Sequence, residues 1–254
     1  MSLRSLVGQI VRRPLDAAGY DVVKRLNPTG SLFDPHYSPW VAGGDARYDA
    51  VFQKANAIAN WVGGRSEAVP MMRERMYVIY WAVRNALRLT GDFVECGVYR
   101  GGSAIICAET SRGAVEGRRF YLFDTFSGTP KADLDESEVG FEHRRADTSV
   151  EVVRERLAEY GDFPVIVQGK VPDTFAELPE FPVAYLHIDI NTAAATSASL
   201  EFFYDRLVKG AVVVFDDYGW EKYSALRERI NSFAAAHAAL VLPLRCGTGI
   251  LVKA

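Results

Sequence analysis

Cysteine is scarce in this sequence of 254 residues: Cys96, Cys107 and Cys246 lie far apart, and no two have a metal-binding spacing. An odd number of scattered cysteines does not predict a disulfide framework, so we expect reduced thiols and a cytoplasmic protein. No apolar run approaches the roughly 20 residues that span a bilayer. Residues 1–13 lack the continuous apolar core and the cleavage site of a secretory signal, so we expect no signal peptide.

Strong net charge is also missing. A formal net charge of −3 does not indicate a basic surface that would bind nucleic acid, so we expect no nucleic-acid partner. Apolar residues make up 49% and charged residues 24% of the chain, which is typical of a globular protein. The length allows one α/β domain with an extension, or two small domains.

From residue 92 onward, short apolar segments alternate with helical patterns. We expect strands at residues 92–98, 119–124, 165–168, 183–189, 211–216, 240–244 and 249–253. We expect helices at residues 48–62, 70–89, 103–110, 149–160, 195–207 and 223–236. This alternation predicts a parallel sheet covered on both faces, and the last two strands, with no helix between them, predict a hairpin. The expected fold is a doubly wound, mostly parallel, seven-stranded Rossmann-like sheet with an antiparallel C-terminal hairpin and an N-terminal helical extension.

The segment from Glu95 to Ser103 is the most informative stretch. An acidic residue near the end of a strand is followed by a glycine-rich turn and the start of a helix. Glycine permits the turn because it tolerates positive φ. A carboxylate beside free helix N–H groups suits a polar, cationic, nucleoside-like ligand better than a pyrophosphate. The alternative is an ordinary strand–turn–helix corner.

Acidic residues recur at the carboxyl ends of the expected strands, where open α/β sheets bind ligands. Asp124 ends the second strand, Asp189 the fourth, and Asp216 and Asp217 the fifth. Burying several carboxylates together is costly unless a cation neutralises them. A sulfonium ligand and a divalent metal are the two candidates. For Asp124 we expect hydrogen bonds to both hydroxyls of a ribose, with a cap on the turn at Thr125 as the alternative.

Three carboxylates at adjacent strand ends suit Mg²⁺, which prefers oxygen ligands. Separate helix-capping aspartates are the alternative for Asp189, Asp216 and Asp217. Asn191 could add an amide oxygen to this site. His187 should point to the opposite face from its neighbours, either as a core histidine or toward the substrate side.

Together these residues resemble the S-adenosylmethionine-dependent O-methyltransferases typified by macrocin O-methyltransferase, a family that methylates sugar hydroxyls of tylosin, mycinamicin and novobiocin. The matching stretches are residues 94–103, 122–130, 186–189 and 215–219. The resemblance runs from about residue 77 to the C-terminus and implies a class I methyltransferase fold. It divides the chain into an arm with helices (residues 1–75), acting as a lid or oligomer contact, and a methyltransferase domain (residues 76–254).

The resemblance implies two cofactors, S-adenosyl-L-methionine and Mg²⁺. Glu95 and the glycine turn would hold the methionine end, Asp124 the ribose, and Gly169 to Val171 would lie near the adenine. The implied cofactor-binding residues are Glu95, Gly97, Tyr99, Arg100, Gly101, Ser103, Asp124, Thr125, Phe126, Ser149, Gly169, Lys170, Val171 and Asp189. The implied metal ligands are Asp189, Asp216 and Asp217.

One position departs from the family pattern. The residue proposed as general base in the family, an aspartate, corresponds here to Asn191, whose amide cannot accept a proton at neutral pH. The base assignment therefore does not carry over. We expect metal activation of the acceptor hydroxyl to dominate, with His187 or water removing the proton, so the expected catalytic set is Asp189, His187 and Asn191.

The expected function is Mg²⁺-dependent O-methylation of a sugar or glycosylated small molecule. A catechol-like hydroxyl or an amino group as acceptor, or a cofactor-binding module without transfer activity, are the alternatives. The exposed aromatics Phe33, Tyr37 and Trp40 favour a homo-oligomer. Acceptor specificity is expected to reside in the N-terminal segment and in the polar loop of residues 131–147, which is either a mobile lid or a solvated loop.

Overall fold

The computed structural model describes residues 45–60, 69–130, 134 and 146–254, all of which belong to one compact unit, Pro39–Ala254. A seven-stranded sheet has the order β3-β2-β1-β4-β5-β7-β6. The strands are β1 (Asp92–Cys96), β2 (Phe120–Asp124), β3 (Pro164–Gln168), β4 (Val183–Ile188), β5 (Leu207–Phe215), β6 (Leu242–Pro243) and β7 (Gly249–Val252). Strands β1 to β5 pair in parallel, and β7 runs antiparallel to both β5 and β6. The predicted fold class is confirmed.

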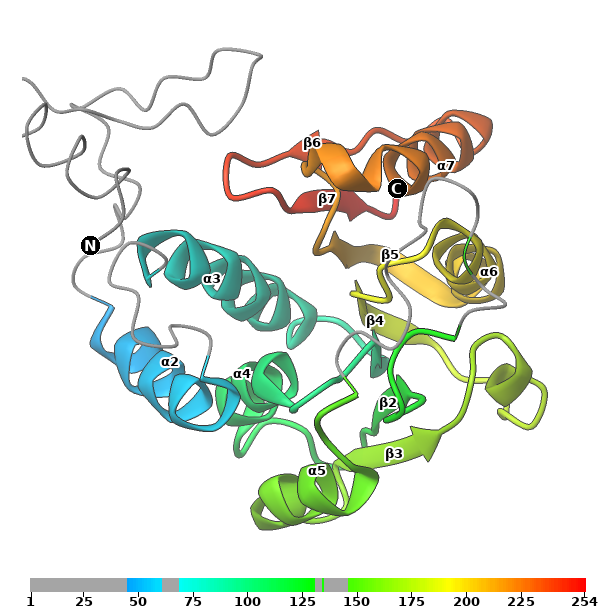
Figure 1. The fold of residues 1–254 in the computed structure, drawn as a ribbon. Helices are drawn as coiled ribbons and strands as arrows, with labels where there is room; N and C mark the ends of the chain where they lie inside the picture. The colour runs from blue at the N-terminus through cyan, green and yellow to red at the C-terminus, as the bar shows by residue number, and fades with distance from the viewer. Residues whose placement is uncertain (1–44, 61–68, 131–133, 135–145) are drawn as a thin grey trace, which may run out of the picture. The chain divides into compact units, whose positions relative to one another are not determined.

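Helices cover both faces of the sheet (Figure 1). They are α2 (Ala46–Ala59), α3 (Val69–Ala86), α4 (Gly102–Ser111), α5 (Val150–Leu157), α6 (Ala193–Phe203) and α7 (Ser224–Ala236), with short 3₁₀ turns η4 (Ala158–Tyr160), η5 (Asp173–Phe175), η6 (Tyr204–Arg206) and η7 (Glu221–Tyr223). One core joins α2 to α5 with the sheet face that carries Phe93 and Tyr185. A second core joins α6 and α7 with the face that carries Val94 and Leu186. Strand alternation therefore decides which core each side chain enters.

Among the element boundaries that differ from the sequence-based expectation, two have a clear cause. Strand β5 begins at Leu207, which we expected to end a helix, because Leu207 pairs with Val183 of β4 and α6 already ends at Phe203. Strand β6 is reduced to Leu242–Pro243 at the sheet edge, since proline has no N–H for a further ladder bond.

The N-terminal side of the described chain packs on the α/β unit. Helix α2 is capped by Asp45, whose side chain accepts from the Tyr48 backbone N–H at 3.0 Å, and it is followed by Asn60, which adopts a left-handed conformation.

The predicted division between residues 75 and 76 falls inside α3. Phe33, Tyr37 and Trp40, and nearly all of the proposed lid, lie outside the described residues, so the lid and oligomer contacts stay predictions. Within the described part of the chain, no helix combines the length and apolarity needed to cross a membrane.

The turn after β1 is locked against the end of β4. Gly97 donates its N–H to the Phe123 carbonyl at 2.8 Å, and the Asp189 N–H donates to the Cys96 carbonyl at 2.8 Å. Gly97 has a φ of +93°, and a Cβ at this position would lie 2.0 Å from the Asp189 carbonyl oxygen. Only glycine allows this approach, which brings the β1 turn and Asp189 together.

We predict that Gly97→Ala lowers the free energy of unfolding by at least about 3 kcal/mol, because a strained φ adds to a backbone collision. The matched control is Gly113→Ala, which has a φ of +79° but no atom within 4 Å of an added Cβ. The control should lose only about 1–2 kcal/mol from backbone strain. Urea denaturation of both variants measures the difference, and equal losses would contradict the collision.

Candidate functional site

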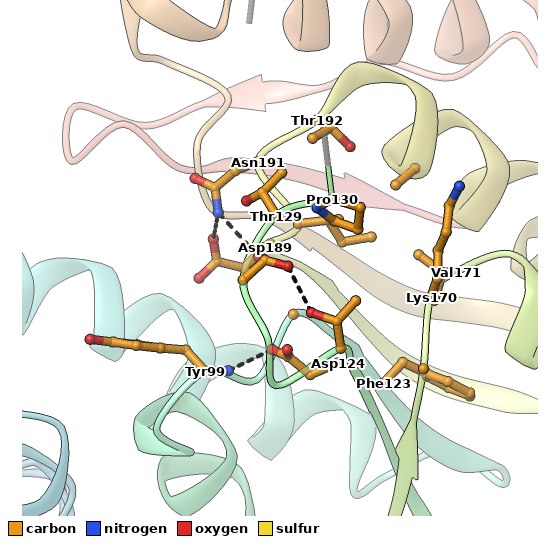
Figure 2. A pocket seen from close by; sticks show the side chains of 16 residues that line it. Tyr99, Phe123, Asp124, Thr129, Pro130, Lys170, Val171, Asp189, Asn191 and Thr192 are labelled. Carbon is orange, nitrogen blue, oxygen red and sulfur yellow. Dashed lines mark hydrogen bonds between the residues drawn. The ribbon is translucent and has the colours of Figure 1, made fainter. Parts of the chain in front are cut away.

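A cavity lies at the carboxyl ends of strands β1 to β4 (Figure 2). Its walls come from the turn after β1, the end of β2 with the segment that follows, the turn after β3, and the segment that leads from β4 into α6. The lining residues are Gly97, Tyr99, Phe123, Asp124, Thr125, Gly128, Thr129, Pro130, Gly169, Lys170, Val171, Asp189, Ile190, Asn191, Thr192 and Ala195. This is the sheet edge at which the sequence predicted a ligand.

Asp124 organises two walls of this cavity. One carboxylate oxygen accepts from the backbone N–H groups of Val98 and Tyr99, each at 2.7 Å, and the other accepts from the Phe126 N–H at 2.7 Å (the bond from Tyr99 is drawn in Figure 2). Tyr99 and Phe126 both have positive φ, so the carboxylate stabilises two strained turns. A carboxylate has about four acceptor positions, which leaves room for about one ligand hydroxyl rather than two. Ribose binding by Asp124 stays a prediction. Its three bonds to backbone N–H groups also give Asp124 a purely structural role.

Glu95 and His187 form a buried pair beneath the glycine turn. They are register partners on β1 and β4, and both are 0% exposed. Glu95 accepts from the Ser103 hydroxyl at 2.5 Å, and its other oxygen lies 3.7 Å from His187 Nδ1. Burial alone lowers the pKa of His187, but the neighbouring Glu95 carboxylate outweighs it and holds the pKa above its usual value. Neither residue lines the cavity, so this position does not support proton removal by His187 or direct cofactor contact by Glu95.

The three predicted metal ligands do come together. Asp189, Asp216 and Asp217 each place a carboxylate oxygen within 4.8 Å of the others. Such a donor set of oxygens suits Mg²⁺. Metal binding itself stays a prediction, and the three carboxylates lie close enough together to form one candidate site.

A guanidinium group lies against this triad, which the sequence analysis did not anticipate. Arg75 of α3 donates from Nε to Asp216 Oδ1 at 3.2 Å, and from one terminal nitrogen to Asp216 Oδ2, to the Asp216 carbonyl at 3.0 Å and to Asp217 Oδ1 at 3.3 Å. Arg75 is 8% exposed. Burial lowers its pKa, but the surrounding aspartates, Asp216 foremost, raise it above the usual value, so the group stays charged. The acidic cluster therefore already holds one cation.

Asn191 is fixed by hydrogen bonds on both sides of its amide. Its oxygen accepts from the Tyr223 hydroxyl at 2.5 Å, and its nitrogen lies 3.4 Å from both Oδ1 and the carbonyl oxygen of Asp189 (Figure 2). The amide oxygen that we expected to join the metal site is therefore engaged by Tyr223. Asn191 instead orients Asp189 through its N–H donors.

The structure separates the predicted site residues into two groups. Those that line the cavity are Gly97, Tyr99, Asp124, Thr125, Gly169, Lys170, Val171, Asp189 and Asn191. Those that lie around it are Glu95, Arg100, Gly101, Ser103, Phe126, Ser149, His187, Asp216 and Asp217. In the second group, Arg100 pairs with Asp147 at 2.5 Å, and Ser149 caps α5 by accepting from the Val152 N–H at 3.4 Å.

Several lining residues were not predicted. Phe123, Gly128, Thr129 and Pro130 belong to the stretch of residues 122–130 that carried the family resemblance, so position in that stretch was a usable signal. Ile190, Thr192 and Ala195 surround the start of α6. The sequence marks that turn only by the polar residues Asn191 and Thr192, which gave no reason to choose its apolar neighbours.

Comparison with known proteins identifies the family. The family model described as macrocin-O-methyltransferase (TylF) matches residues 66–244, which is more than half of the chain. The chain belongs to this family.

Two curated relatives are similar to part of the chain. A tetracenomycin-C 4'-O-methyltransferase of Streptomyces olivaceus, named for an acceptor that carries a 2,3-dimethoxy-α-L-rhamnosyl group, is 30% identical over 153 residues, covering 56% of this chain and 58% of its own. Mycinamicin III 3''-O-methyltransferase of Micromonospora griseorubida is 29% identical over 178 residues, covering 65% of this chain and 69% of its own. The match thus spans under two thirds of the first relative.

Solved structures share the fold. The O-methyltransferase NovP superposes with a TM-score of 0.69 at 20% identity, covering 82% of this chain and 99% of its own. The calicheamicin methyltransferase CalS11 superposes with a TM-score of 0.61 at 22% identity, covering 80% of this chain and 91% of its own. At these identities the likeness establishes the architecture.

We predict that Asp124→Asn destabilises the fold by about 1–3 kcal/mol and weakens binding of S-adenosylhomocysteine. One carboxylate oxygen becomes an amide nitrogen, so at least one of the three buried N–H groups loses its acceptor. Asp162→Asn, at an exposed position, is the control and should change neither quantity. Denaturation and calorimetry measure the two effects, and a neutral Asp124→Asn would contradict the organising role.

Proposed function

We propose that this protein is an S-adenosylmethionine-dependent O-methyltransferase that acts, with Mg²⁺, on a hydroxyl of a sugar or glycosylated small molecule. The observation that carries the proposal is the position of Asp189. It lines the cavity and also contributes an oxygen to the acidic triad. One side chain therefore joins the cavity at the sheet edge to a candidate cation site, which is the arrangement that metal-assisted transfer to a hydroxyl requires.

The chain's own residues would bind and orient the reactants. The turn of Gly97 and Tyr99, braced by Asp124, and the segment from Gly169 to Val171 provide walls for an extended nucleoside ligand. S-adenosylmethionine, when bound, supplies a methyl group on a sulfonium centre. Holding the acceptor oxygen about 3 Å from that methyl group could lower the barrier by several kcal/mol.

Proton removal has to be accounted for without the usual aspartate. Asn191 is an amide with both ends engaged, and His187 is buried beside Glu95. Asp189, Asp216 and Asp217 would hold Mg²⁺, which supplies Lewis-acid activation and lowers the pKa of an acceptor hydroxyl. We therefore assign the proton to water entering the cavity. The family relatives named for sugar-bearing acceptors support a saccharide as the acceptor class.

The direct test combines binding and turnover. Calorimetry with S-adenosylhomocysteine should show saturable binding, and a screen of glycosylated small molecules, catechols and amines should give turnover on the glycosylated compounds. EDTA should abolish that turnover and Mg²⁺ should restore it, because the triad would lose the ion that activates the hydroxyl.

Each part of this test can fail separately. Turnover unaffected by EDTA would contradict the metal assignment, and turnover restricted to catechols or amines would contradict the acceptor class. Cofactor binding without turnover on any acceptor would favour a cofactor-binding module.

Two matched variants separate the cation site from the cofactor cavity. Asp217→Asn and Asp189→Asn should both lose turnover, because each removes one carboxylate from the triad. Both should keep affinity for S-adenosylhomocysteine within about threefold, that is, within about 0.7 kcal/mol, since asparagine preserves shape. If Asp189→Asn collapses cofactor affinity while Asp217→Asn does not, Asp189 serves the cofactor rather than the metal.

A further inference from the structure

Arg75 engages the oxygens that a metal ion would need. Its guanidinium contacts both carboxylate oxygens of Asp216 and Oδ1 of Asp217. These two residues supply two of the three carboxylates of the triad. A guanidinium at this place also repels a second cation, and burial strengthens that repulsion because it removes screening by water.

We propose that Arg75 is a tethered cation that holds the triad together in the metal-free protein, and that a divalent ion binds by displacing the guanidinium from Asp216 and Asp217. The inference rests on the proposed function, because it takes the triad as a divalent-cation site. It adds a regulatory element to that site: metal binding is weakened by an internal competitor and is coupled to a movement of one side chain on α3.

The electrostatics explain why the metal-free protein needs such a group. Asp216 and Asp217 are 8% and 9% exposed, and two adjacent carboxylates with so little water would repel each other and destabilise the site. Arg75 prevents this, since arginine keeps its charge at any physiological pH. The site therefore persists without an ion and stays ready to exchange one cation for another.

In the position that it takes beside the carboxylates, Arg75 also lies near an indole ring. The Arg75 guanidinium carbon lies 5.8 Å from the centroid of the Trp220 ring, within range of a cation–π interaction. Movement of the guanidinium away from the carboxylates therefore changes its distance from the indole ring. Because Trp220 senses this charge, its fluorescence reports where the guanidinium lies.

Binding of Mn²⁺ alone to the full chain tests the competition. Titration followed by the EPR signal of free Mn²⁺ gives the affinity of the wild type, of Arg75→Gln and of Arg84→Gln. The last variant is the matched control, because Arg84 is an exposed arginine of the same helix that bonds only to the Tyr80 hydroxyl among the contacts of described residues. We expect Arg75→Gln to bind Mn²⁺ at least tenfold more tightly than the wild type, and Arg84→Gln to match the wild type. Equal or weaker binding of Mn²⁺ by Arg75→Gln would overturn the proposal. It would mean that Arg75 and the ion bind to the triad at the same time.

A second measurement covers the case in which Arg75→Gln does not fold. Mg²⁺ titration of the wild type should change the tryptophan emission in a saturable way, and Trp220→Phe should lose that change. If Mn²⁺ binds to the wild type while Mg²⁺ leaves the Trp220 emission unchanged, the displacement is refuted although the metal site stands. If the wild type binds S-adenosylhomocysteine but neither it nor Arg75→Gln binds Mn²⁺, the metal part of the proposed function fails together with this inference.

Discussion

The ion pairing of Arg75 with Asp216 and Asp217 is the constraint on which the candidate site depends. The strand ends of a doubly wound sheet collect polar groups at one edge, and here that edge carries several carboxylates with little access to water. Each charged carboxylate needs hydrogen-bond donors or positive charge to offset the loss of water there. Arg75 provides both to Asp216 and Asp217, and it comes from a helix far earlier in the chain. Helix α3 therefore stabilises the positions of Asp216 and Asp217 as much as the sheet does.

The same rule explains two other acids, the half-buried Asp124 and the buried Glu95. Asp124 takes three backbone N–H groups, and those bonds fix the turns after β1 and β2. Glu95 takes the Ser103 hydroxyl at the start of α4 and faces His187 on the neighbouring strand. Asp124 therefore secures a wall of the cavity and Glu95 a contact beneath it, and the ligand surface is built on groups that the fold itself requires. Removing such a group affects folding and binding together, which is why matched controls are needed to separate the two.

The sequence predicted the sheet, its hairpin and the convergence of Asp189, Asp216 and Asp217, because strand ends in a parallel sheet meet at one edge regardless of side-chain detail. The sequence predicted less well which face of the sheet each strand residue occupies. Glu95 and Cys96 are neighbours at the end of β1 and face opposite sides of the sheet. Glu95 therefore enters the layer under α4 rather than the cavity. Arg75 could not be found by periodicity at all. It lies in a helix whose apolar spacing indicated only core packing, and nothing local in the sequence points to a partner 141 residues away.

Asn191 shows how an amide fits the surroundings of this position. Its amide accepts from Tyr223 and donates toward Asp189, so the two ends of one side chain meet an O–H donor and a carboxylate. An aspartate here would satisfy Tyr223 equally well but would place a second carboxylate 3.4 Å from Asp189 Oδ1, in a cluster where Arg75 is already shared between two acids. The amide therefore lowers the charge of the cluster by one and gives Asp189 a donor. Under the proposed function Asn191 supplies no base, so the cation held by the triad would set the acidity of the acceptor hydroxyl. Exchange of the guanidinium for a divalent ion would then be the event that prepares the site for transfer.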